Sequence, residues 1–319
     1  MAIEPRRHEI EGQHGALRHP RRSWLLRGDF LAAMLFISPW IIGFAWFQLF
    51  PIAASFYYSF TSYNMMQPPR FVGMENYSRL FTEDALFRKS LANTAVYTVF
   101  SVPLGLIIAF VFALLLNREI PGRALFRALF YFPAVIPSVA TAILWIMLLN
   151  TQGGLVNNVL KTIGLSPKPW LTSPDWTMPS LILLSLWGVG PSVVIFLAGL
   201  QGVSRELYES ARLDGAGPFR LIRDVTIPMM TPVILFNLVT GIIYALQVFA
   251  QPFILFGSRS GNPGGPLNSV LMYSVQLYTV AFNQFQMGYA AAMAWVLFVM
   301  IFSLSLLTMR LSTRFVHYE

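Results

Sequence analysis

Six long apolar segments dominate the hydrophobic pattern of the chain. Each is at or above the roughly 20 residues that a helix needs to cross a membrane. Polar stretches separate them, and their cores carry almost no charge. The pattern predicts an all-α integral membrane protein with about six transmembrane helices. The predicted spans are Phe30–Phe60, Leu91–Leu116, Ala124–Leu149, Pro179–Leu200, Thr226–Leu255 and Gly288–Met309.

Composition agrees with this pattern. Of the 319 residues, 55% are hydrophobic and only 11% are charged, whereas a soluble domain has about 25% charged residues. We expect a polar N-terminal segment at 1–29, a transmembrane domain at 30–310 and a short tail at 311–319. The first apolar segment is long and has no cleavage signature, so it is expected to be a retained helix. With no cysteine, disulfides and cysteine-based metal sites are excluded.

The basic residues indicate the orientation. With the N-terminus inside, about two thirds of the 22 Lys and Arg residues fall on the cytoplasmic side. Both termini are therefore expected to be cytoplasmic, which requires an even number of spans. We attribute the net charge of +8 to the Lys and Arg residues that set the orientation and contact membrane lipid. No nucleic-acid partner is expected.

The acidic residues bear on how transport could be driven. All 14 Asp and Glu residues lie outside the six apolar cores. Charges inside a membrane usually mark ion coupling or proton relays, so their absence argues against a secondary carrier. A secondary carrier or channel for a polar neutral solute is the alternative interpretation, and it predicts intramembrane charges or an inverted repeat.

An integral-membrane enzyme is a third interpretation, and the chain offers little for it. The four histidines, His8, His14, His19 and His317, all lie in the tails. A phosphate-binding loop is absent from the sequence, so any ATP must be bound by another chain. We therefore expect no catalytic residue, metal or cofactor on this chain.

A short polar stretch between the fourth and fifth spans predicts one capped helix of about ten residues. Ser204 suits the N-cap, and Glu206 lies in the first turn, where the helix dipole favours an acid. Gly215 or Gly217 can end the helix in a left-handed conformation, with Pro218 directly behind. The stretch is too polar to span a membrane.

This stretch resembles the EAA loop of permease subunits of binding-protein-dependent ABC importers. The family pattern appears as Glu209-Ser210-Ala211, Gly215 and Val225-Thr226-Ile227-Pro228, with mild departures at three positions. Asp214, Ala216 and Phe219 extend the likeness to the carbohydrate-uptake branch, represented by the first permease subunit of the maltose and glycerol-phosphate systems. Further resemblances cover nearly the whole chain beyond residue 30: Phe71–Tyr77, Asn93–Thr94 and Phe132–Pro137.

The resemblance implies a type I ABC importer permease in a prokaryotic inner membrane. Its partners would be a second permease subunit, two ATPase subunits that carry ATP and magnesium, and an external solute-binding protein. Glu209 would contact the ATPase and Gly215 would form the turn. Without the motif, Glu209 would be an ordinary solvated residue. The implied ATPase-coupling residues are Glu206, Glu209, Ala211, Asp214, Gly215, Ala216 and Pro228.

Polar residues recur along the fifth predicted span in steps of three and four, so they are expected to share one helical face. Such a face should point into the bundle or a wet cavity, and amides, hydroxyls and aromatic rings suit a neutral sugar. Hydrogen bonding between two permease subunits is the competing interpretation. The candidate substrate-path residues are Trp187, Gly188, Asn237, Thr240, Gly241, Tyr244, Gln247 and Gln251.

Two external loops contain further helical patterns. The first predicts a short helix at Leu155–Ile163. The second predicts an amphipathic helix at Asn268–Phe282, with Val270, Leu271, Val275 and Tyr278 at helical spacing. Such elements would lie on the outer surface, either receiving a partner or resting at the membrane interface.

Overall fold

The computed structural model describes residues 28–118 and 121–312. The predicted N-terminal segment and C-terminal tail therefore lie almost entirely outside the described residues. The chain divides into two compact units, Met1–Ala54 and Ser55–Glu319. In the first unit, α1 (Gly28–Phe44) continues through a π-helical turn, η2 (Ala45–Leu49), into α2 (Phe50–Ser59), which ends in the second unit.

The second unit is almost wholly helical, apart from a small antiparallel hairpin of β1 (Thr61–Ser62) and β2 (Arg70–Phe71). Its first helices are α3 (Glu75–Thr82), α4 (Ala85–Leu116), α5 (Arg123–Val135), α6 (Ser138–Leu148), α7 (Leu155–Thr162), α8 (Pro174–Trp187) and α9 (Gly190–Gly202). Then follow α10 (Arg205–Leu213), α11 (Pro218–Arg220), the π-helix η3 (Leu221–Thr226), α12 (Ile227–Leu246), α13 (Ala250–Ser260), the 3-10 turn η4 (Pro266–Asn268), α14 (Tyr273–Tyr278), the π-helix η5 (Thr279–Asn283) and α15 (Met287–Ser312).

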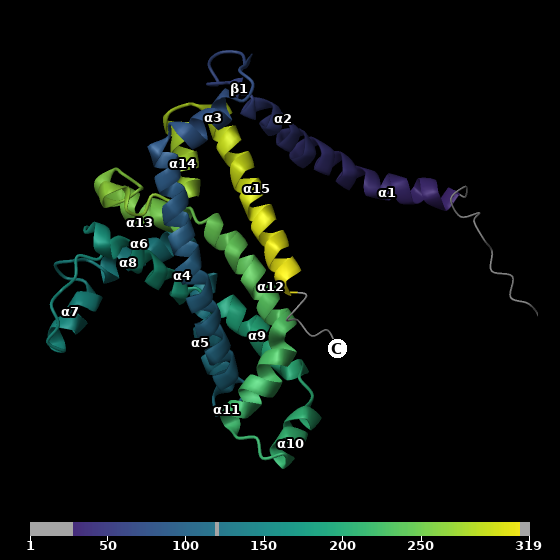
Figure 1. Cartoon of the computed structure of the whole chain (residues 1–319), viewed down its shortest axis with the longest axis vertical. Helices are drawn as coiled ribbons and strands as arrows, with labels where there is room; N and C mark the ends of the chain where they lie inside the picture. The colour runs from purple at the N-terminus through teal and green to yellow at the C-terminus, as the bar shows by residue number, and fades with distance from the viewer. Residues whose placement is uncertain (1–27, 119–120, 313–319) are drawn as a thin grey trace, which may run out of the picture. The chain divides into compact units, whose positions relative to one another are not determined.

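Helix α4 is the central element of this unit. Asp84 caps its N-terminus, because the Asp84 carboxylate accepts a hydrogen bond of 2.8 Å from the backbone N–H of Phe87. The helix packs against α8, α9, α12 and α14 (Figure 1). Its residues contribute to all three buried apolar clusters: Tyr97 and Val102 to one, Phe87 to the second, and Ala109 and Ala113 to the third.

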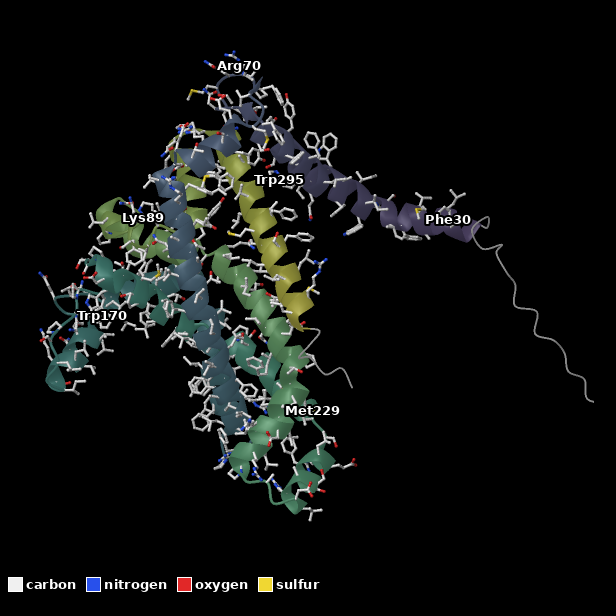
Figure 2. The ribbon with its side chains drawn as sticks, viewed as in Figure 1. Phe30, Arg70, Lys89, Trp170, Met229 and Trp295 are labelled. Atoms are coloured by element: carbon white, nitrogen blue, oxygen red, sulfur yellow. The ribbon has the colours of Figure 1, made fainter. Side chains whose placement is uncertain are left out.

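Side chains tie the start of α4 to the loop before α14. Lys89 Nζ donates a hydrogen bond of 2.8 Å to the carbonyl of Leu267, and the Asn93 amide donates to the carbonyls of Asn268 and Leu271. Figure 2 shows Lys89 and Arg70 toward one end of the second unit, while Met229 lies toward the opposite end, near α10. The two ends are thus built from different segments of the chain.

The predicted six-span membrane fold is confirmed. Four helices in the described part of the chain are long and apolar enough to cross a membrane, and two bent helix pairs bring the number to six if each pair is one span. The spans are Phe30–Ser59, Ala85–Leu116, Arg123–Val135 with Ser138–Leu148, Pro174–Trp187 with Gly190–Gly202, Pro218–Gly257 and Met287–Ser312.

The two bends have local causes. α5 and α6 meet at 99° across Ile136, whose extended backbone is the conformation that a following proline imposes. α8 and α9 meet at 47° across Gly188. Gly190 then lets α9 approach α5 closely, because a Cβ at this position would lie 2.5 Å from the Phe130 carbonyl oxygen.

The two external loops turn out differently. The short helix predicted at Leu155–Ile163 is present as α7. The prediction of a surface helix at Asn268–Phe282 is wrong: this stretch contains a 3-10 turn, the short α14 and a π-helix, and Val270, Leu271 and Val275 are buried in the core. The neighbouring Met272 is also fully buried. The prediction used the spacing of four apolar positions, but burial here extends to neighbouring positions, among them the polar Gln276.

Tyr273 shows how completely this segment is enclosed. Its side chain has no exposed surface, and its hydroxyl donates a hydrogen bond of 2.8 Å to the carbonyl of Met293 on α15. Burial raises the pKa of the Tyr273 hydroxyl, since the charged phenolate would lose its hydration. The hydroxyl therefore stays protonated and joins α14 to α15.

Candidate functional site

The polar stretch between the fourth and fifth spans forms the helix that its caps predict. Ser204 is the N-cap, and its Oγ accepts a hydrogen bond of 3.2 Å from the backbone N–H of Glu206. Glu206 lies in the first turn and Arg212 in the last, so each charge interacts favourably with the opposite partial charge at its end of the helix. The helix, α10, has nine residues, close to the predicted ten.

The end of α10 is fixed by Gly215. Its φ of +80° is left-handed, whereas Gly217 has an ordinary φ of −73°. The N–H of Gly215 donates to the carbonyl of Arg212, and the N–H of Ala216 donates to the carbonyl of Ala211. These two bonds form a Schellman motif, which satisfies the last carbonyls of the helix. Of the two glycines predicted to end it, Gly215 does so.

Helix α10 has two distinct faces. Tyr208 is half-buried and, with Arg212 one turn later, lines a cavity against the membrane-spanning helices. Glu206, Glu209 and Leu213 lie on the other side and are exposed. Leu213 is 89% exposed, and Phe219, just beyond the turn, is 76% exposed. Two large apolar side chains thus project into solvent from the polar loop that carries Glu209.

The loop is attached to the fifth span by a hydrogen bond between side chains. The Tyr208 hydroxyl and Thr226 Oγ1 are 3.1 Å apart, and Thr226 also donates to the carbonyl of Leu221 at 3.1 Å. Thr226 is 2% exposed and ends the π-helix η3. π-helical turns of this kind often occur at functional sites. Pro228 follows in the first turn of α12, directly after this π-helical turn.

The remaining predicted residues of the loop have simple environments. Asp214 is the exposed C-cap of α10, and Ala211 and Ala216 are half-buried beneath the turn. The only ion pair in the described part of the chain is Arg223–Asp224 at 3.7 Å. Both of its side chains are largely exposed, so it contributes little to stability. The acidic and apolar groups of the loop therefore remain available to a partner.

The polar stripe of the fifth span is divided by the structure. Asn237 is 3% exposed, and its amide donates to the carbonyl of Val233 in its own helix. Tyr244 is 78% exposed, and Gln247 is also exposed. α12 ends at Leu246, so Gln251 lies on the separate helix α13. The expectation of one continuous helical face is therefore wrong, because the chain leaves helical geometry between the two helices.

Two further residues of the stripe face their own helix or a neighbour. Thr240 Oγ1 donates to the backbone carbonyl of Phe236 at 2.8 Å. Gly241 lies against α4, where a Cβ would be 3.1 Å from Val102 Cγ1. Tyr244 and Gln247, at the end of α12, are thus the members of the stripe that present their side chains most openly.

Trp187 and Gly188 occupy the bend of the fourth span. Trp187 is 41% exposed and packs edge-to-face on Trp145, with ring centroids 6.0 Å apart. Trp145 is 6% exposed, and its Nε1 finds no hydrogen-bond partner in the part of the chain that the structure describes. Trp145 and Ala245, the neighbour of Tyr244, belong to the same buried cluster. The exposed indole of Trp187 is therefore held by the core that carries the end of α12.

Sequence reasoning missed three features of the site. The Tyr208–Thr226 hydrogen bond joins positions 18 residues apart, and spacing cannot reveal it. Leu213 and Phe219 were detectable as large apolar residues in a polar loop, although their exposure required the structure. The close approach at Gly190 has only a Gly-Pro pair as its signal. Among the residues that the structure describes, there is no group of three or more His, Asp or Glu side chains that could hold a metal ion.

The chain is similar in sequence to a family of membrane proteins and to individual members of known name. Residues 101–317 match the model of the binding-protein-dependent transport system inner membrane component. The chain is 41% identical to the probable ABC transporter permease protein YesP of Bacillus subtilis, over 94% of this chain and 96% of that protein. It is 34% identical to the lactose transport system permease protein LacF of Rhizobium radiobacter, over 90% and 95% of the two chains.

A solved structure extends the likeness to three dimensions. One chain of the bacterial alginate ABC transporter, crystallised with an alginate pentasaccharide-bound periplasmic protein, superposes with a TM-score of 0.77. The two chains are 26% identical, and the match covers 91% of this chain and 96% of that one. The likeness therefore extends over nearly the full length of both chains.

Proposed function

This chain belongs to the family of inner-membrane components of binding-protein-dependent transport systems, and we propose that it is the permease subunit of an ATP-driven sugar importer. It forms half of the pathway through the prokaryotic inner membrane, and a second permease subunit forms the other half. Both termini face the cytoplasm. An external binding protein delivers the solute, and two ATPase subunits bind ATP and magnesium, so this chain carries no catalytic group.

The observation that carries the proposal is the construction of α10. It is capped at both ends, exposes Glu209 and Leu213 on one side, and is bonded to the fifth span through Tyr208 on the other. A rigid helix held in this way can transmit a displacement from a bound protein to a membrane span. We assign the ATPase contact to Glu206, Glu209, Leu213 and Phe219, with Gly215 setting the turn between the last two.

The coupling follows from differential binding. If closure of the ATPase dimer draws two such helices together, ATP stabilises the outward-facing state of the pathway relative to the inward-facing one. Moving such an equilibrium from 1:99 to 99:1 takes about 5.5 kcal/mol of differential affinity. ATP and the loaded binding protein would supply this free energy jointly, and hydrolysis would return the pathway to its resting state.

Support for a sugar comes from two sources. One of the named relatives is a lactose transport permease, and the solved relative belongs to an alginate transporter. The described spans present neutral polar groups, among them the hydroxyl of Tyr244 and the amide of Gln247 at the end of α12. An exposed indole such as Trp187 can stack on the apolar face of a sugar ring.

Transport by reconstituted protein tests the proposal. The chain, its partner permease, the ATPase and the binding protein would be placed in liposomes, with radiolabelled lactose and maltose as probes. We expect uptake of a probe only with ATP on the ATPase side, and no effect of a proton or sodium gradient. Uptake that needs the gradient and ignores ATP would instead identify a secondary carrier.

A further inference from the structure

A cavity of about 570 Å³ lies behind α10, between this helix and the end of α4. The transport role proposed above assigns it no ligand. Its walls come from α4, α9, α10 and the segment Pro218–Thr226, so four parts of the chain meet around it. Its polar and charged lining residues include Asn117, Arg118, Tyr208 and Arg212.

The charged groups of the cavity are both cationic. Arg118 follows the last turn of α4, and Arg212 lies in the last turn of α10. Among the residues that the structure describes, none of those lining the cavity is a carboxylate. Neither guanidinium makes an ion pair or hydrogen bond with another residue that the structure describes. Two sets of planar donors therefore line one space, and such groups suit phosphate oxygens.

The rest of the lining is largely apolar. Leu114, Leu115 and Leu200 form a wall next to the two arginines, with Asn117 and Tyr208 as neutral polar groups. The cavity volume of about 570 Å³ is many times the roughly 30 Å³ that one water occupies in the liquid. A bare phosphate ion would therefore fill only a small part of the cavity. The cavity also lies beside the end of the apolar span Ala85–Leu116, where we expect the lipid headgroups to be. An anionic amphiphile would fit the two arginines, the apolar wall and the position of the cavity at the end of the span.

We propose that this cavity binds an anionic phospholipid of the cytoplasmic leaflet, with its phosphate between Arg118 and Arg212 and the start of an acyl chain against Leu115. The bound lipid would link the end of α4 to the inner face of α10 beside Tyr208. Its effect on coupling rests on the proposed transport function, whereas the binding itself rests on the geometry of the cavity.

Native mass spectrometry of the purified full-length chain tests the binding. The chain would be titrated with phosphatidylglycerol or with phosphatidylcholine of the same acyl length. We expect phosphatidylglycerol to be retained about tenfold more tightly, the ratio that corresponds to 1.4 kcal/mol. The double variant Arg118→Gln, Arg212→Gln should lose this preference. Arg220→Gln, an exposed arginine of the same loop outside the cavity, should keep it.

Two further arms identify the source of the phosphate. Leu115→Trp, at a half-exposed wall position, should weaken retention of phosphatidylglycerol by filling the space for the acyl chain. Millimolar inorganic phosphate or glycerol phosphate should not displace the lipid. Displacement would mean a site for a soluble phosphate compound and would overturn the proposal. Equal retention of both lipids, or a preference that survives in the double variant, would also overturn it.

The test is independent of the proposed transport function because it uses this chain alone. A failed ATPase contact at Leu213 would leave the lipid preference measurable, and a lost lipid preference would leave the ATPase contact measurable. Thermal unfolding of each variant in detergent provides the folding check. Only variants that unfold within a few degrees of the parent chain would be compared.

Discussion

The hydroxyl of Tyr208 on α10 lies 3.1 Å from Thr226 Oγ1, at the point where the π-helix η3 passes into α12. This hydrogen bond is the direct side-chain connection between the exposed helix and the fifth span. Thr226 is buried and is also bonded to its own helix, so it cannot move without that helix. A displacement of α10 is therefore expected to reach the span through this pair.

Removing either hydroxyl should weaken the link. Tyr208→Phe and Thr226→Val each delete one partner of a part-buried hydrogen bond, worth about 1 kcal/mol. We expect both variants to lower binding-protein-stimulated ATPase activity in the assembled transporter. Thr226→Val also removes the bond to the Leu221 carbonyl, so the double variant should lose little more than Thr226→Val alone, because Tyr208→Phe removes a bond that this change has already broken. Tyr131→Phe, which deletes an exposed hydroxyl on α5, is the control. Additive losses would show that the two hydroxyls act separately.

The turn after α10 offers a matched pair of glycines. Gly215→Ala places a side chain at a φ of +80°, which costs about 1 kcal/mol, whereas Gly217→Ala is placed at a φ of −73° with open space around it. Gly215→Ala should therefore weaken binding of the ATPase subunit, measured by co-purification, and Gly217→Ala should leave it unchanged. Equal effects of the two changes would contradict the role of the left-handed turn.

The crossing of α5 and α9 should depend on Gly190. An alanine there would bring its Cβ to 2.5 Å from the Phe130 carbonyl oxygen, so a helix must shift. Overpacking of this kind costs about 1–3 kcal/mol, and we expect a lower thermal unfolding temperature in detergent. Gly202→Ala, in the last turn of α9 with no atom within 4 Å of the new Cβ, is the control. A Gly190→Ala chain as stable as the control would show that the approach is looser than described.

The end of α12 should contribute to solute recognition. Tyr244→Phe removes a hydroxyl from a side chain that is 78% exposed, so the change should not disturb the core. We expect a higher KM for uptake of the transported probe sugar and an unchanged basal ATPase activity. Tyr57→Phe, at another half-exposed tyrosine, should change neither quantity. If KM is the same in both variants, the Tyr244 hydroxyl does not contact the solute.

Much of this molecule could be predicted from its sequence because membrane spans and helix caps are local signals. The run of apolar residues gave the six spans, and Ser204 and Gly215 gave both ends of α10. The spaced motif around Glu209 predicted the family, and the comparisons confirm it.

The parts that sequence could not supply depend on distant contacts. The burial of Val270 and Leu271 follows from packing against residues far away in the sequence. The bend at Gly188 and the break after Leu246 interrupt helices inside apolar runs whose spacing gave no sign of them. The polar stripe was predicted as one face because its spacing is regular, but regular spacing holds only while the helix continues. The roles of Trp187 and Gln251 in a substrate path stay predictions.

The ATPase contact can be measured directly because the chain has no cysteine of its own. A single Leu213→Cys chain would be assembled with its ATPase and treated with a short thiol-reactive crosslinker. A single Met66→Cys chain would serve as the control, because Met66 is exposed and lies between β1 and β2, and Figure 1 shows β1 at the opposite end of the second unit from α10. We predict a crosslinked product with the ATPase from position 213 and none from position 66. A product from position 66, with none from position 213, would contradict α10 as the docking element.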